Sequence, residues 1–99
     1  MPKGWSLRWT SLALADLRGI RSYVARDKPE AAKSLAERIR ASVLRLRELP
    51  ESGRIVPELE PRGYREVLVP PFRIVYEVRA REVVILRVWH GRRDLTGSW

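Results

Sequence analysis

The sequence predicts an α+β domain in which a helix hairpin packs on one face of a small, mainly antiparallel sheet, in the order β-α-α-β-β-β. Three observations lead to this prediction. Residues 12–49 place apolar side chains at helical spacing on both sides of a proline. Residues 64–90 contain three short strand-like segments separated by turns. A chain of 99 residues has room for one such domain, so residues 1–99 form a single unit.

The first predicted elements are a short strand over residues 6–9 and a helix over residues 12–25. Apolar side chains alternate with polar ones around the strand, at Trp5, Leu7 and Trp9. Thr10 or Ser11 then offers an N-cap for the helix. Its apolar face is formed by Ala13, Leu17, Ile20 and Val24.

Pro29 starts a second helix, which is predicted to run to about Leu49, because proline fits the first helical turn. The apolar stripe of this helix consists of Ala32, Leu35, Ile39, Val43 and Leu46. Only residues 26–28 separate the two helices, so they must form an antiparallel hairpin. Pro50 ends the second helix, and the glycines and prolines of residues 51–63 indicate a surface loop.

Three strands are predicted at residues 64–69, 72–79 and 83–90. Alternation directs one set of side chains toward the helices, and these are Phe72, Ile74, Tyr76, Val78, Val84, Leu86 and Val88. The helix-free face is expected to carry Arg73, Val75, Glu77, Arg79, Ile85, Arg87 and Trp89. Arg73 and Arg87 would therefore present positive charge that suits an anionic partner. We expect Tyr76 to be a core tyrosine with a hydrogen-bonded hydroxyl.

Composition and charge restrict the function further. The chain has no cysteine and one histidine, which leaves no disulfide framework and no zinc ligand set, and we expect no metal or cofactor. It contains no apolar run that could cross a membrane or act as a signal peptide, so we expect a cytoplasmic protein. The net charge is +8, and residues 1–50 carry eleven Lys or Arg against five Asp or Glu. Such a surface suits nucleic acid or an acidic protein.

Several short motifs occur together and in a fixed order along the chain. They are Ala15-Asp16-Leu17, Pro29-Glu30-Ala31-Ala32, Ser52-Gly53-Arg54, Arg65-Glu66, Phe72-Arg73-Ile74-Val75-Tyr76 and Val88-Trp89-His90-Gly91-Arg92-Arg93-Asp94. With these motifs, residues Trp9 to Leu95 resemble the RelE/ParE superfamily of type II toxin-antitoxin toxins, and specifically its ParE-like branch. The resemblance implies the fold described above and a cognate antitoxin that wraps around the toxin and neutralises it.

The activity that the resemblance implies depends on the branch. RelE-like members are ribosome-dependent endoribonucleases that cut messenger RNA, whereas ParE-like members poison DNA gyrase without an agreed catalytic set. Arg73 stands where RelE-like toxins keep a phosphate-binding arginine, and Arg93 matches a second one. Glu66 and Trp99, however, occupy positions where the nuclease pattern has a basic residue and a tyrosine.

Proton-transfer chemistry also argues against the nuclease branch. RNA cleavage by the 2′-hydroxyl needs a base and an acid, and arginine exchanges protons poorly because its pKa lies above roughly 12. His90 is the one side chain with an ordinary pKa near neutrality, and it either takes part in catalysis or completes a hydrogen-bond network at the strand end. No catalytic residue is therefore assigned; in a nuclease the set would be Arg73, Arg93 and His90.

We predict a ParE-like toxin that inhibits gyrase, with a partner-binding surface formed by Arg65, Arg73, Arg87, Trp89, Arg92 and Arg93. Trp89 either exposes its indole on the helix-free face or packs at the edge under the C-terminal tail. Arg92, Arg93 and Asp94 either belong to this surface or form a turn held by an Arg–Asp pair. The alternatives for the whole chain are a RelE-like endoribonuclease acting on ribosome-bound mRNA, and a non-toxic relative that acts only in complexes with the antitoxin and its operator DNA.

Overall fold

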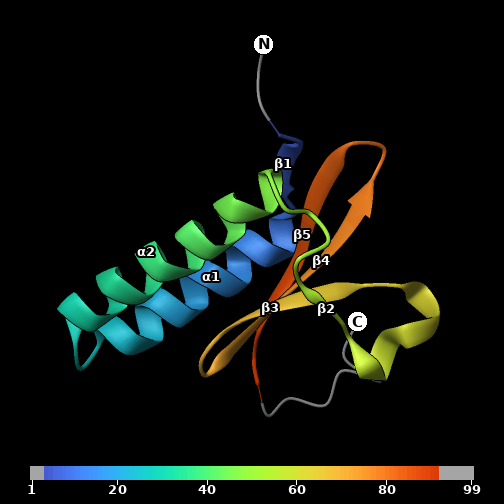
Figure 1. Cartoon of the computed structure of the whole chain (residues 1–99). Helices are drawn as coiled ribbons and strands as arrows, with labels where there is room; N and C mark the ends of the chain where they lie inside the picture. Colours follow the sequence, from blue (N-terminus) through green and yellow to red (C-terminus); the bar gives the residue numbers. More distant parts are fainter. Residues whose placement is uncertain (1–3, 92–99) are drawn as a thin grey trace.

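The computed structural model describes residues 4–91, and the elements follow the predicted order (Figure 1). The helices are α1 (Ser11–Ala25) and α2 (Pro29–Leu44), and the 3-10 helices are η1 (Arg45–Arg47) and η2 (Pro57–Arg62). The strands are β1 (Ser6–Trp9), β2 (Arg54–Ile55), β3 (Arg65–Val69), β4 (Phe72–Arg79) and β5 (Glu82–His90). The predicted α+β architecture is confirmed.

The five strands form one sheet in the order β1-β5-β4-β3-β2, and the helix hairpin covers one of its faces (Figure 1). Strand β1 runs parallel to β5, beginning with the pair Ser6 and Glu82, and the other neighbouring strands are antiparallel. Parallel strands need a long connection, and here residues 10–81, which contain the hairpin and strands β2 to β4, supply it. None of the helices within residues 4–91 is long and apolar enough to cross a bilayer.

One threonine both starts α1 and fixes it to the sheet. The Thr10 hydroxyl oxygen accepts a hydrogen bond from the Ala13 N–H at 3.1 Å, as expected of an N-cap. The same hydroxyl donates to the Leu86 carbonyl oxygen on β5 at 3.0 Å. The second helix ends at Leu44, earlier than predicted, and η1 continues the chain for one further turn.

The main core lies between the hairpin and the sheet. Its buried members are Ala13, Leu17, Leu35, Ile39, Val43, Leu46, Val69, Ile74, Tyr76, Val83, Ile85 and Val88. The Tyr76 hydroxyl donates to the Pro50 carbonyl oxygen at 2.8 Å and accepts from the Gly53 N–H at 2.9 Å. The expected core tyrosine is confirmed, and burial raises its pKa.

A β-bulge changes which side of β5 faces the helices. Val75 pairs with Arg87 and Tyr76 pairs with Ile85, so Leu86 is an extra residue in the strand. As a result Ile85 faces the helices, and Leu86 packs on the opposite face. The prediction that Val84 and Leu86 would face the helices and Ile85 would not was wrong, because strict alternation does not continue through a bulge. Val88 lies where it was predicted.

Residues 51–63 are more ordered than a surface loop. They contribute β2 and η2, and Val56 and Leu59 are buried there. These two side chains pack with Val75 and Trp89 in a second, smaller core on the helix-free face. The prediction of a surface loop was wrong because the segment covers apolar side chains that the strands expose on that face.

Candidate functional site

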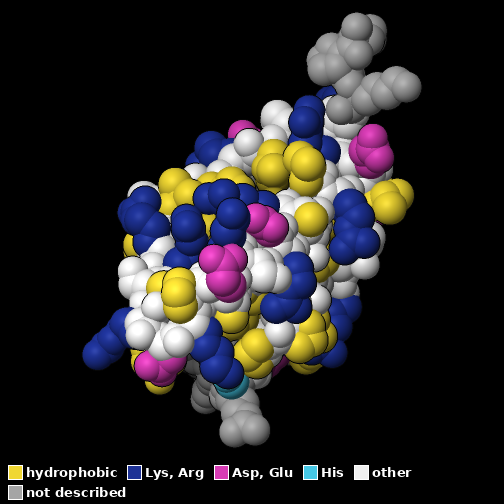
Figure 2. All heavy atoms as spheres, turned by 90° about the vertical axis from the view of Figure 1, so that its left-hand side faces the viewer, with side chains coloured by type: hydrophobic (Ala, Val, Ile, Leu, Met, Phe, Trp, Pro, Cys, Tyr) yellow, Lys and Arg dark blue, Asp and Glu magenta, His cyan; other side chains and the backbone are white. Residues whose placement is uncertain are grey.

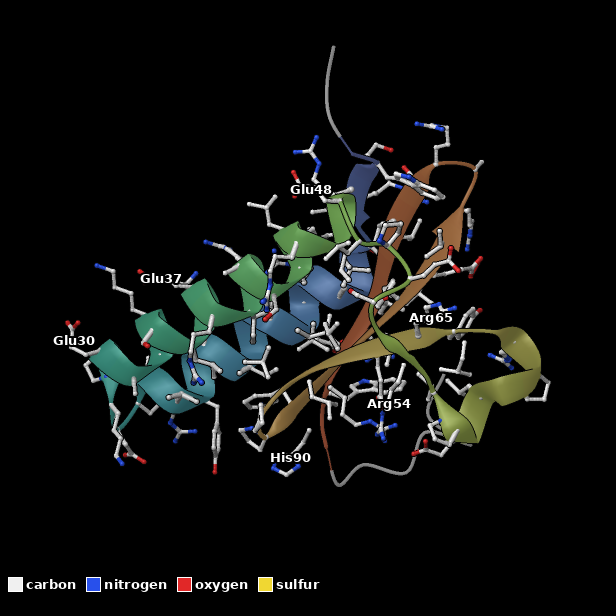
Figure 3. All side chains as sticks on the ribbon, viewed as in Figure 1. Glu30, Glu37, Glu48, Arg54, Arg65 and His90 are labelled. Carbon is white, nitrogen blue, oxygen red and sulfur yellow. The ribbon has the colours of Figure 1, made fainter. Side chains whose placement is uncertain are left out.

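The helix-free face carries a continuous ion-pair network rather than an open cationic surface. The Glu66 carboxylate accepts two hydrogen bonds of 2.6 Å, one from the Arg73 Nε–H and one from the Arg54 Nε–H. The two terminal nitrogens of the Arg73 guanidinium donate to the Glu58 carboxylate at 2.7 and 2.9 Å. Arg54 extends from β2 beside β3 (Figure 3). All three nitrogens of Arg73 are therefore engaged by carboxylates.

The Glu66–Arg73 pair of this network is buried. The Glu66 side chain is 0% exposed and the Arg73 side chain 7%. The hydrogen bonds from Glu58 and Glu66 raise the pKa of Arg73 above its usual range, and the hydrogen bond from Arg73 lowers the pKa of Glu58 to about 2. Two arginines and two glutamates give the network no net charge. The expectation that Arg73 presents positive charge at the surface was therefore wrong.

Trp89 and Arg87 are also held inside the structure. Trp89 lies on the helix-free face but is only 3% exposed, in contact with the second core, so the hypothesis of an exposed indole was wrong. The Arg87 guanidinium lies 4.5 Å from the centre of the Trp89 ring and donates to the Asp16 carboxylate at 2.8 and 3.0 Å. This bond raises the pKa of Arg87, and the same carboxylate accepts the Val88 N–H. Asp16 of α1 thus fixes β5.

The remaining predicted site residues occupy different places. Arg65 donates to the Gly53 and Glu51 carbonyl oxygens at 2.8 and 3.2 Å and so holds the start of β2. His90 is exposed at the end of β5, with its ring edge-on to Phe72 (Figure 3). Arg92, Arg93, Asp94 and Trp99 lie outside the described residues. No three His, Cys, Asp or Glu side chains within residues 4–91 are grouped to hold a metal ion.

An apolar groove of about 590 Å³ opens between α1 and the adjoining ends of β4 and β5. Its α1 wall is formed by Ala15, Gly19, Ile20 and Tyr23, and its sheet wall includes Phe72 and His90. Tyr23 is 74% exposed. Sequence reasoning did not identify this groove. The sequence does contain a signal for this groove, because Ala15, Gly19 and Tyr23 are spaced four positions apart and therefore lie on one side of α1.

The arginines of the strands and the cations of the hairpin have opposite environments. Every strand arginine within residues 4–91 has a carboxylate partner, and these arginines are Arg8, Arg54, Arg65, Arg73, Arg79 and Arg87. None of the hairpin cations forms a salt bridge with another described residue, and all of them are exposed: Arg18, Arg21, Arg26, Lys28, Lys33, Arg38 and Arg40. Figure 2 looks toward the loop end of the hairpin and shows more Lys and Arg than Asp and Glu there.

Comparison with known proteins decides the family. Residues 7–95 match the family model of the ParE toxin of the type II toxin-antitoxin system parDE. The chain belongs to the ParE toxin family. Among curated relatives of this ParE-family chain, Toxin RelE2 of Caulobacter vibrioides is 42% identical over 86 residues, which are 86% of this chain and 93% of the relative. Toxin ParE3 of the same organism is 32% identical over 81 residues, or 82% of this chain and 80% of the relative.

Solved structures agree with this family. A chain of the chromosomal ParDE toxin-antitoxin system from P. aeruginosa superposes on this ParE-family chain with a TM-score of 0.75 and 31% identity, covering 87% of this chain and 95% of that one. A chain of the RelBE2 toxin-antitoxin complex from Mycobacterium tuberculosis gives a TM-score of 0.63 at 22% identity, with 88% and 98% coverage, and shows the shared fold. The chain is thus a type II toxin of the RelE/ParE superfamily, as its motifs predicted.

Proposed function

We propose that this ParE-family toxin inhibits DNA gyrase and is held inactive by a cognate antitoxin. The observation that carries the proposal is the enclosure of Arg73. This arginine stands where the ribonuclease branch places a phosphate-binding arginine, yet Glu58 and Glu66 occupy its three nitrogens. An RNA phosphate could bind there only by displacing a carboxylate.

The proton-transfer chemistry of the described residues supports the same proposal. Cleavage of RNA requires one group that removes a proton and another that supplies one. The arginines at 73 and 87 have raised pKa values and stay protonated, and the Tyr76 hydroxyl is buried and bonded on both sides. His90 is the one imidazole of the sequence, whereas the reaction needs two proton-transfer groups, and arginine is a poor choice for the second. A toxin that acts by binding fits these residues better than a nuclease.

An antitoxin partner is supported by the relatives and by the apolar groove. The P. aeruginosa relative belongs to a ParDE toxin-antitoxin system. In the present chain the groove beside α1 offers Ile20, Tyr23 and Phe72 as apolar walls, which suits apolar side chains of an amphipathic antitoxin segment. Occupation of this groove would also cover the exposed ring of Tyr23.

The decisive experiment compares two activities of the purified toxin. We expect it to inhibit DNA supercoiling by purified gyrase and to leave mRNA intact in a translating extract. Addition of a cognate antitoxin should reverse the inhibition. Cleavage of mRNA without any effect on gyrase would overturn the proposal in favour of the endoribonuclease alternative. Normal growth of cells that express the chain alone would favour the non-toxic alternative.

A further inference from the structure

We propose that the α1–α2 hairpin binds the phosphate backbone of duplex DNA, in a groove lined by Arg18, Arg21 and Lys33. The inference extends the proposed function, because gyrase acts while it holds duplex DNA. Contact between toxin and DNA would add affinity for the enzyme in its DNA-bound form. The DNA contact itself does not depend on gyrase and can be measured without it.

The first argument is the distribution of free positive charge. Ion pairs neutralise the strand arginines, so these add little to the positive field of the described chain, whereas the seven exposed cations of the hairpin have no salt bridge within residues 4–91. The side chains of Arg18 and Arg21 project from α1, and that of Lys33 projects from α2. All three are exposed, and none of them has a carboxylate within salt-bridge distance among residues 4–91. Unpaired cations retain their full attraction for a polyanion.

The second argument is the shape of the surface that holds these cations. They line a concave site of about 440 Å³ where the two helices lie side by side. Arg18 and Arg21 are three positions apart and so share one side of α1, while Lys33 approaches from the other helix. The rest of the lining consists of small residues, namely Ser22, Ala25, Pro29 and Ala32. A backbone can therefore approach closely while the three longer side chains reach its phosphates.

The third argument distinguishes nucleic acid from an acidic protein. A protein segment gains most of its affinity by burying large apolar side chains. The basic groove contains no large apolar residue, whereas the groove on the other side of α1 has Ile20, Tyr23 and Phe72. Binding to phosphates relies on charge and on release of counterions and needs no apolar surface. The hairpin acids Asp27, Glu30 and Glu37 do not line the basic groove.

The test measures binding of a fluorescein-labelled 20-base-pair duplex by anisotropy between 50 and 200 mM KCl. The logarithm of the affinity falls by about 0.9 per decade of salt for each phosphate neutralised. We expect the variant Arg18→Gln/Arg21→Gln/Lys33→Gln to lose about 2 to 3 units of this slope and about tenfold or more in affinity at 100 mM KCl. The matched control, Lys28→Gln/Arg38→Gln/Arg40→Gln, also removes two arginines and one lysine, but from positions of the hairpin that do not line the groove.

The control should retain most of the slope, and circular dichroism should show that both variants are folded, because all six side chains are exposed. Equal slopes for the two variants, or no binding of the duplex by the wild-type toxin at 50 mM KCl, would overturn the inference. Loss of antitoxin binding with unchanged DNA binding in the groove variant would also overturn it and would assign the groove to an acidic protein. DNA binding as expected without inhibition of gyrase would leave the inference intact and overturn the proposed function.

Discussion

Replacing Arg73 by alanine should destabilise the whole domain rather than remove a surface contact. The Glu66 side chain is 0% exposed in the wild type, and the substitution would leave Arg54 as its one remaining ion-pair partner. Glu58 would lose its ion pair with Arg73. Breaking a buried ion pair from one side costs about 3–5 kcal/mol. A domain of this size has about 5–15 kcal/mol of stability in total. We therefore expect Arg73→Ala to lose about a fifth or more of the free energy of unfolding of the wild type.

Urea unfolding followed by tryptophan fluorescence measures this loss directly. Arg79→Ala is the matched control, because Arg79 lies on the same strand and pairs with Glu77 at an exposed position. We expect little change in that variant. A midpoint for Arg73→Ala that stays close to those of the wild type and of Arg79→Ala would refute the buried network. Loss of toxicity in Arg73→Ala is then interpretable only after its folded fraction has been measured.

Three further outcomes are expected. Because the pKa of Glu58 is about 2 in the folded chain against 4.5 ordinarily, its contribution to stability is present above about pH 4.5 and is lost as the pH falls toward 2; the difference in urea stability between wild type and Glu58→Gln should shrink over that range. Gly53→Ala should lower the melting temperature, since a Cβ there would lie 2.5 Å from the Tyr76 hydroxyl oxygen. In its control, Gly19→Ala, the added Cβ meets nothing within 4 Å, and the substitution should stabilise α1 by up to about 1 kcal/mol. Gly19→Leu should keep gyrase inhibition but weaken antitoxin binding, because the leucine side chain would fill the apolar groove. If Gly19→Leu binds the antitoxin as tightly as Gly19→Ala does, the antitoxin binds elsewhere.

The sequence predicts those parts of the fold that depend on local regularity. The helix stripes, the proline that starts α2 and the N-cap at Thr10 each depend on residues a few positions apart, and the structure contains all of them. The position of Tyr76 was predictable for the same reason, because its strand alternates regularly up to that residue.

The details of the site depend on residues far apart in the chain. Arg73 looked like a surface cation because its partner Glu58 lies 15 positions earlier, and Arg87 pairs with Asp16 across 71 positions. No local pattern reveals such partners. The bulge at Leu86 shifts by one residue the alternation of β5 side chains between the two faces of the sheet, and no Gly or Pro marks the bulge in the sequence. The second core was missed because Val56 and Leu59 lie among residues typical of a turn.

The parallel pairing of β1 with β5 determines when this chain can fold during its own synthesis. Thr10 bonds to Leu86, 76 positions later, and β5 lies between β1 and β4 in the sheet. Until the ribosome has made residues 82–90, the first strand has no neighbour and α1 has no sheet to cover. Contacts of such long sequence separation form late and slowly. The folding of β1 and α1 onto the sheet should therefore wait for residues 82–90, which makes it one of the last steps in forming the described domain.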